Sequence, residues 1–192
     1  MNRADAVAQL QQTWEILNAD LDAAVKYGRL DNTPYAQRAL VRAFFAAVEG
    51  LSFQMRQVTL ASLAGTEFIT EQEVQLLREV RHSLDEKGHP KETPVFLPFP
   101  ESLLFSLSIY AKNHGAVFEV DKSQQGWQAL RQATKVRNNV THPKTPESLT
   151  LTSVDLQALM NASRWWQATL LSLFKACNEA DEYWNAKLGD PK

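Results

Sequence analysis

Apolar residues recur at steps of three and four along most of the chain, which is the spacing of one face of an α-helix. The first predicted helix covers residues 4–27 and is expected to end at Gly28. The second covers residues 34–64, with a proline in its first turn and Gly65 as its expected end. Because this second segment is apolar on nearly every side, it predicts a central helix that is buried by its neighbours.

The same periodicity, together with capping signals, predicts four more helices. The third covers residues 70–84 and begins with a capping box. The fourth covers residues 101–114 and the fifth 126–141. The sixth covers residues 153–185, and the segment from Thr152 to Asp155 resembles an N-terminal cap with an acid in the first turn. Residues 88–100 carry four prolines, which exclude a regular helix. The apolar residues between them indicate a packed segment, which either folds over the core or contacts a partner. The expected fold is therefore all-α with one irregular, Pro-rich insertion.

The length of 192 residues fits a single helical domain over 1–192, with the insertion at 88–100 and a frayed tail at 187–192. A net charge of −2 means that the molecule as a whole does not attract nucleic acid. The lone cysteine, Cys177, fits a reducing compartment. The N-terminus has no signal-peptide pattern and no apolar run reaches membrane-spanning length, so we expect a cytoplasmic protein with no membrane segment.

The fifth predicted helix carries the candidate chemistry. Asp121 and Ser123 are both able to cap its start. Pro143 disfavours a helical conformation at His142, so the helix should end near Thr141.

On a helical wheel, Arg137 lies in the middle of the apolar half of this helix. A guanidinium stays charged at ordinary pH, so a buried one needs a partner, water or an interface. His142 follows five residues later, and Asn138 lies beside the arginine. An arginine, an imidazole and an amide at one helix end suit a phosphate better than a core. The alternative is a structural arginine that pairs with an acid on a neighbouring helix and does nothing else.

The sequence Arg137-Asn138-x-x-x-His142 resembles the Arg-x4–6-His signature of HEPN domains, in the common form where a polar residue follows the arginine. The resemblance implies an all-α, up-and-down bundle of four to five long helices and a metal-independent endoribonuclease that uses no cofactor. The segment from Arg42 to Glu49, with its aromatic pair, also resembles the second helix of HEPN domains, and Glu49 is a natural partner for Arg137. Two protomers of the family commonly bring their motifs together, which implies a C2 homodimer with one composite site.

In the implied reaction, a ribose 2′-hydroxyl of RNA attacks the adjacent phosphate. His142 is the expected general base or acid, and Arg137 is expected to stabilise the charged phosphorane. Asn138 would orient the imidazole or the phosphate, with Glu49 and Arg42 as supporting residues.

Basic residues surround this motif. From Lys122 to Pro146 the chain carries five basic residues and no acid. We expect Lys135, Arg131 and Lys144 to bind RNA phosphates. The alternative for this basic patch is an ordinary solvated helix face.

Two further functions remain open at this point. One is a non-catalytic helical module that binds RNA or a protein. The other is a toxin-like role in stress or defence, controlled by a neutralising protein partner. The aromatic run Arg164-Trp165-Trp166 fits base stacking, although tryptophans at helical spacing more often belong to a core or a dimer interface.

Other polar groups also have alternative interpretations. His82 and His89 lie near acids, but their spacing matches none of the usual zinc patterns, so no metal is expected. His114 is interpreted as a favourable contact with a helix C-terminus and no more. The charged residues of the second predicted helix form one narrow stripe, which is either its wet edge or a set of donors and acceptors for a polar site. They are Arg38, Arg42, Glu49 and Arg56.

Overall fold

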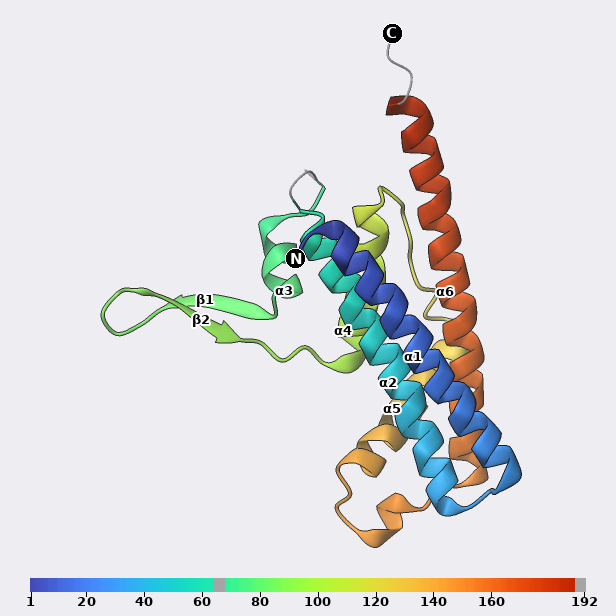
Figure 1. Cartoon of the computed structure of the whole chain (residues 1–192). Coiled ribbons are helices and arrows are strands. Elements are labelled where there is room, and N and C mark those ends of the chain that lie inside the picture. Colours follow the sequence, from blue (N-terminus) through green and yellow to red (C-terminus); the bar gives the residue numbers. More distant parts are fainter. Residues whose placement is uncertain (64–67, 189–192) are drawn as a thin grey trace. The chain divides into compact units, whose positions relative to one another are not determined.

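The structure is a computed structural model that describes residues 1–63 and 68–188 (Figure 1). Those residues are mostly helical, with one two-stranded antiparallel sheet. The elements in chain order are α1 (Arg3–Leu30), α2 (Pro34–Ala61), α3 (Glu71–Leu77), β1 (Val80–Leu84), β2 (Pro90–Pro94), α4 (Phe99–Asn113), α5 (Gln125–Thr141), the 3₁₀ helix η1 (Pro146–Leu149) and α6 (Ser153–Leu188).

The chain forms two compact units. The first unit comprises Met1–Gln9, Ser52–Phe118 and Lys175–Lys192, and the second comprises Leu10–Leu51 and Glu119–Phe174. The candidate motif therefore lies wholly in the second unit.

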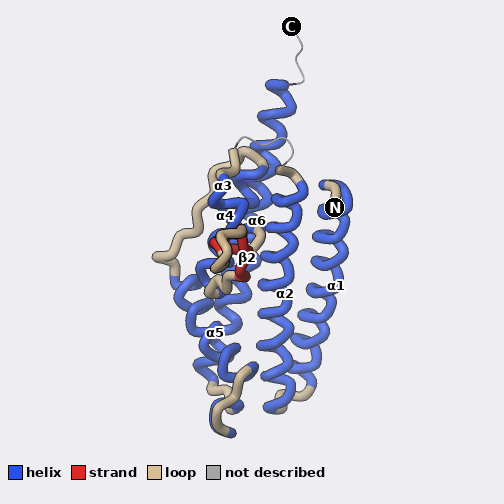
Figure 2. The backbone as a smooth tube through the Cα atoms, turned by 90° about the vertical axis from the view of Figure 1, so that its left-hand side faces the viewer, coloured by secondary structure: helices blue, strands red, loops and turns tan. Residues whose placement is uncertain are grey.

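The second unit has its core between α2, α5 and α6, and α1 runs beside α2 (Figure 2). Trp127 on α5 packs against Trp165 on α6, with ring centroids 5.7 Å apart. The largest fully buried side chains of this unit are Val41, Phe44, Val48, Leu51, Leu130, Leu170 and Leu173. The predicted burial of the second helix is therefore confirmed, because α2 supplies four of these residues.

In the first unit, α4 supplies the fully buried Leu103, Leu107 and Ile109, and α2 supplies Met55 and Val58. The predicted third helix is too long, because α3 ends at Leu77. Its start is as predicted: the capping box at Thr70 is formed, with the Thr70 hydroxyl accepting from the Glu73 N–H. The helix ends because Glu79 adopts a left-handed backbone conformation with φ of 53°. A non-glycine residue in that region cannot continue a right-handed helix.

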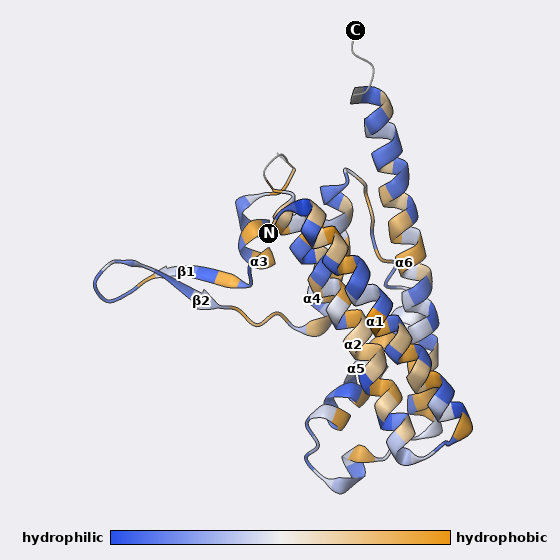
Figure 3. Ribbon diagram, in the orientation of Figure 1, coloured by the Kyte–Doolittle hydropathy of each residue, from blue (hydrophilic) through white to orange (hydrophobic). Residues whose placement is uncertain are grey.

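The chain then forms a hairpin where the sequence predicted helix and irregular coil. β1 and β2 pair antiparallel, from Val80 opposite Pro94 to Leu84 opposite Pro90. Figure 1 shows the hairpin extending away from α3, and Figure 3 shows that most of it is hydrophilic. Residues 80 and 84 are four apart, a spacing that suits a helix as well as a strand, so periodicity misassigned the segment.

The hydrogen bonds just beyond the two strands determine which backbone N–H groups point away from the partner strand. The Val95 N–H donates to the Glu79 carbonyl at 2.8 Å, and the Asp85 N–H donates to the His89 carbonyl at 2.9 Å. In an antiparallel pair, hydrogen-bonded and non-hydrogen-bonded positions alternate. Both prolines of β2 therefore occupy non-hydrogen-bonded positions, where the missing N–H costs the ladder nothing.

The Pro-rich insertion is also less tightly packed than predicted. Phe96 is 91% exposed, so this ring does not pack against the core. Residues Val95 and Leu97 on either side are partly buried. The alternation arises because the extended chain between β2 and α4 directs successive side chains to opposite faces.

Of the other predicted helix ends, one is confirmed and one is wrong. α5 ends at Thr141, as predicted. α1 continues through Gly28 to Leu30, so the predicted stop is wrong: glycine permits a helix end but does not impose one. The end predicted at Gly65 lies outside the described residues. Of the tail predicted to fray, residues 187–188 belong to α6 and residues 189–192 lie outside the described chain.

Of the N-terminal caps of the last two helices, one is as predicted and the other is not. α6 begins with the predicted pair, since the Asp155 N–H donates to the Thr152 hydroxyl and the Thr152 N–H to the Asp155 carboxylate. The predicted caps of α5 are wrong, because the N-cap is Gln124 and the Asp121 carboxylate instead accepts from Ser123. None of the helices in the described ranges is both long and apolar enough to cross a membrane.

Candidate functional site

Arg137 is held between α5 and α2. Its Nη2 donates to Glu49 Oε1 in an ion pair, and its Nη1 donates to Asn138 Oδ1 at 2.9 Å. The guanidinium carbon also lies 5.8 Å from the centroid of the Phe45 ring, within cation–π range. The side chain keeps 25% of its surface exposed, and that of Glu49 keeps 38%. The arginine in the apolar half of α5 is thus paired, stacked and still in contact with solvent.

Another arginine, on α2, contacts the end of α5. Arg42 Nη2 donates to the carbonyl of Val140 at 3.4 Å. Val140 is in the last turn of the helix, where carbonyls have no partner within the helix itself. Two of the predicted supporting residues, Arg42 and Glu49, therefore contact α5 from positions about two turns apart on α2, and both hold the segment that carries the motif.

His142 lies immediately after α5. Its N–H donates to the Asn138 carbonyl at 2.9 Å, which closes the final turn, and its φ of −127° and ψ of 64° take the chain out of the helix. The residue is exposed. Within the described part of the chain, its imidazole makes no hydrogen bond. The imidazole thus lies at the surface, five residues from an anchored guanidinium.

The three residues predicted to bind phosphates are all exposed: Arg131, Lys135 and Lys144. At 100° per residue, Arg131, Lys135 and Asn138 fall within about 60° of one another on α5. Arg137 lies roughly a third of a turn away from this row, facing α2. One protomer therefore presents a basic row and, on an adjoining face, a guanidinium whose carboxylate partner is fixed.

In the charged stripe of α2, Arg56 is buried, so the wet-edge alternative is wrong for this residue. Arg42 is exposed and Arg38 and Glu49 are partly exposed, yet each of them also forms a hydrogen bond or an ion pair. Arg38 Nη1 donates to the Leu149 carbonyl at the end of η1, at 3.3 Å. In the first unit, Arg56 is only 7% exposed. Its Nη1 donates to the hydroxyls of Ser102 and Ser106, at 3.1 and 2.8 Å. Its Nη2 pairs with Glu79 at 2.8 Å.

Sequence reasoning missed a polar cluster in the first unit. His114 Nδ1 lies 2.9 Å from the Asp181 carboxylate, the His114 side chain is 11% exposed, and its ring packs against Tyr110 with centroids 4.9 Å apart. Burial, reinforced by Asp181, raises the pKa of the nearby Cys177 thiol to about 12. His114 is therefore more than a dipole contact. The only sequence signal was a histidine at a helix end, because Asp181 is 67 residues away.

Burial decides the alternative for the two tryptophans of α6. Trp165 and Trp166 are 7% and 3% exposed, so they belong to the core and are not stacking platforms. His82 and His89 lie near single carboxylates in the hairpin, at 3.9 and 3.5 Å. No group of three or more His, Cys, Asp or Glu residues among those described is arranged to hold a metal ion.

A scan against protein-family models finds no match, and searches of curated proteins and of solved structures find no significant match either. The site must therefore be interpreted from its own chemistry.

Proposed function

We propose that the chain is a HEPN-like, up-and-down helical bundle that cleaves RNA without a metal, at a composite site formed by two copies of the molecule. The observation that carries the proposal is that Arg137, anchored and partly exposed, and His142, which is exposed, lie five residues apart at the end of one helix. A cytoplasmic location fits the single cysteine and the lack of a membrane-spanning helix among the described residues.

The reaction would be a transesterification. His142, as a neutral imidazole, takes the proton of the ribose 2′-hydroxyl while the oxygen attacks phosphorus. The bond from phosphorus to the 5′-oxygen of the next nucleotide breaks. An imidazolium, which the second copy can supply, protonates that leaving oxygen. The products are a 2′,3′-cyclic phosphate and a 5′-hydroxyl, and neither step needs a metal.

Arg137 would stabilise the negative charge on the phosphorane oxygens. Glu49 and Asn138 act as positioning residues in this scheme, because both accept hydrogen bonds from the guanidinium. A phosphate that approaches must share the guanidinium with the Glu49 carboxylate, and the two anions repel each other. We therefore expect Glu49→Gln to tighten RNA binding while it lowers kcat, because the guanidinium is less constrained.

The first test is RNA cleavage in EDTA with the full chain, analysed for cyclic-phosphate ends. The variants are His142→Ala and Arg137→Ala, with His89→Ala as the matched control, because that histidine is exposed in the hairpin and has no role in the scheme. Both site variants should lose at least ~100-fold in rate, and His89→Ala should cut like the parent. Undiminished cleavage by His142→Ala would remove this mechanism.

A second candidate is a non-catalytic module that binds RNA or a protein partner, including a neutralising partner of a toxin-like chain. The observation that favours it is that Glu49 and Arg42 both fasten the end of α5, which a purely structural role would also require. Under this alternative, several single-stranded RNAs stay intact, and Arg131→Gln or Lys135→Gln weakens RNA binding while His142→Ala has no effect.

The composite site has its own test. Sedimentation equilibrium of the full chain should give a dimer at the concentrations where RNA is cut. Mixing inactive Arg137→Ala with inactive His142→Ala chains should restore a small part of the activity, because each mixed dimer keeps one intact arginine and one histidine base but lacks the second histidine that protonates the leaving oxygen. Activity in a strictly monomeric protein would contradict the composite site.

A further inference from the structure

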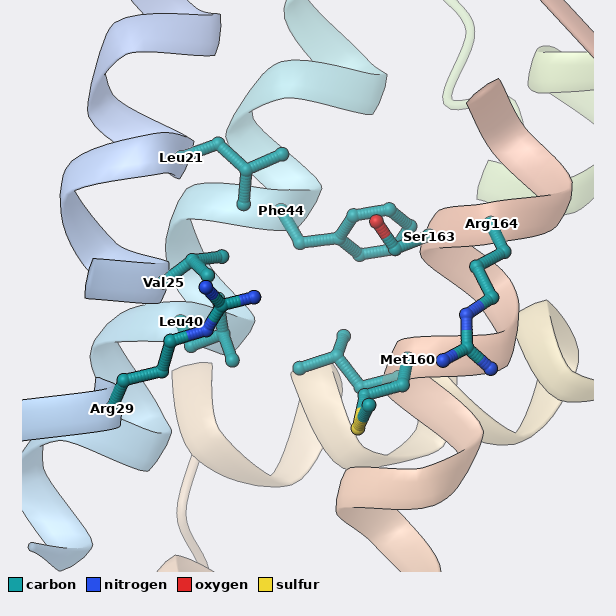
Figure 4. Close-up of a pocket in the computed structure, with 9 residues that line it drawn as sticks. Leu21, Val25, Arg29, Leu40, Phe44, Met160, Ser163 and Arg164 are labelled. Atoms are coloured by element: carbon teal, nitrogen blue, oxygen red, sulfur yellow. The ribbon is translucent and has the colours of Figure 1, made fainter. Parts of the chain in front are cut away.

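A pocket in the second unit, apart from the Arg137 site, is lined by α1, α2 and α6 (Figure 4). Its volume is about 220 Å³. Leu40, Phe44 and Leu159 form its apolar inner wall, and Met160, which is 48% exposed, lies where it meets the surface. A cavity of about 150 Å³ accommodates a benzene ring, and drug-sized ligands occupy roughly 300 Å³ or more. The volume therefore suits an apolar group somewhat larger than one ring.

Two arginines enter this pocket from opposite sides. Arg29 comes from the last turn of α1 and Arg164 from α6. Figure 4 shows the Arg29 guanidinium beside Val25 and Leu40, and the Arg164 guanidinium beside Met160 on the opposite side of the pocket. Ser163 adds one hydroxyl, and the lining includes no acidic residue. Neither arginine forms an ion pair with any residue in the described part of the chain. The pocket thus joins apolar surface to two positive charges without a counter-charge from the protein.

We propose that this pocket binds a small amphipathic anion: a monocarboxylate whose alkyl chain lies against Leu40, Phe44 and Leu159 while its head group binds Arg29 and Arg164. The planar guanidinium matches a carboxylate with two parallel hydrogen bonds, which a single charge on a flexible amine does not offer. The apolar wall selects for a saturated chain, since it offers no polar group to a base or a sugar. The site requires neither RNA nor a second copy of the chain.

The test is isothermal titration of the full chain with sodium octanoate. Affinity should rise about fourfold for each methylene from hexanoate to octanoate, because each one adds the same increment of buried apolar surface. Octylamine, which has the same chain and the opposite charge, should bind at least ~100-fold more weakly, because it meets both arginines. Adenosine monophosphate, an anion on a polar body, should not compete with octanoate.

Substitutions separate this site from non-specific binding. Arg29→Gln and Arg164→Gln should each weaken octanoate binding at least ~tenfold, the loss of one charge-assisted hydrogen bond. Both side chains are exposed, so the variants should fold. Lys26→Gln is the matched control: it removes one positive charge from an exposed position of α1 outside the pocket, and it should bind like the parent.

Equal binding of octylamine, equal loss in Lys26→Gln, or no chain-length dependence would each overturn the proposal. Displacement of octanoate by adenosine monophosphate would also overturn it, because the pocket would then select a nucleotide. RNA is absent from every arm, so the outcome is independent of the nuclease assay.

Discussion

The two partners of the Arg56–Glu79 ion pair are buried to different extents, so replacing one should cost more stability than replacing the other. Arg56 is buried, and burial lowers the pKa of its guanidinium while the Glu79 carboxylate opposes that shift. Glu79 is different, because its side chain is 44% exposed. Removing the carboxylate therefore leaves a charge in the core, whereas removing the guanidinium leaves a charge that water can solvate.

The two perturbations are Glu79→Gln and Arg56→Met. Breaking a fully buried pair from one side costs about 3–5 kcal/mol, and breaking an exposed pair costs about 0–1 kcal/mol. Because one partner is half-exposed, we expect Glu79→Gln to lower the free energy of unfolding by about 2 kcal/mol, between these two ranges, since the amide oxygen can still accept from Arg56 but carries no compensating charge. Arg56→Met removes the buried charge and fills a similar volume, so we expect a loss below about 1 kcal/mol.

Glu79→Gly adds a control for the backbone. A left-handed conformation costs a non-glycine residue roughly 1–2 kcal/mol, and glycine avoids that cost. The glycine variant should therefore be more stable than the glutamine variant by about 1 kcal/mol, although both lack the carboxylate. Urea unfolding followed by far-UV circular dichroism measures all three, with an unchanged m-value as the condition for comparison. If Arg56→Met is less stable than Glu79→Gln, the asymmetry of burial does not govern this pair.

Two other predictions concern packing and pH. A Cβ atom at Gly126 would lie 2.4 Å from Trp165, so Gly126→Ala should lower the unfolding free energy by about 1–3 kcal/mol; Gly28→Ala has open space and should raise it by about 0.5–1 kcal/mol. Equal melting temperatures for the two variants would contradict the packing. Burial raises the pKa of Cys177 from 9.0 to about 12 and that of Tyr110 from 10.0 to about 12. The folded state then holds these protons more tightly, so their contribution is intact below pH 9.0 and is lost as the pH rises toward about 12. Urea midpoints measured across this window should fall, and less steeply in Cys177→Ala; a pH-independent midpoint would refute the argument.

Local rules predicted the elements whose causes are local. The capping boxes at Thr70 and Thr152 and the helix end at Thr141 follow from residues within four positions of each. Glu49 was expected to be the partner of Arg137, which lies in the apolar half of its own helix, and the structure brings the two side chains together. Such pairings are accessible to sequence reasoning because a buried charge narrows the choice of partner.

The errors arise where the cause is distant or conformational. The left-handed backbone conformation of Glu79 ends α3, and a glutamate side chain does not predict that conformation. The partner of Glu79, Arg56, lies on another helix. The pair of His114 and Asp181 spans 67 residues and depends on how α4 meets α6. The pocket between Arg29 and Arg164 has no sequence signature at all, because it is the space that three helices leave between them.

The prolines of β2 have a consequence for how the molecule behaves at high concentration. Of the backbone nitrogens that β2 turns away from its partner strand, those of Pro90 and Pro94 carry no hydrogen, which leaves only the Glu92 N–H between them. A third strand from another molecule would find one donor where it needs three. The projecting ribbon can therefore stand in solvent without seeding edge-to-edge growth on that side.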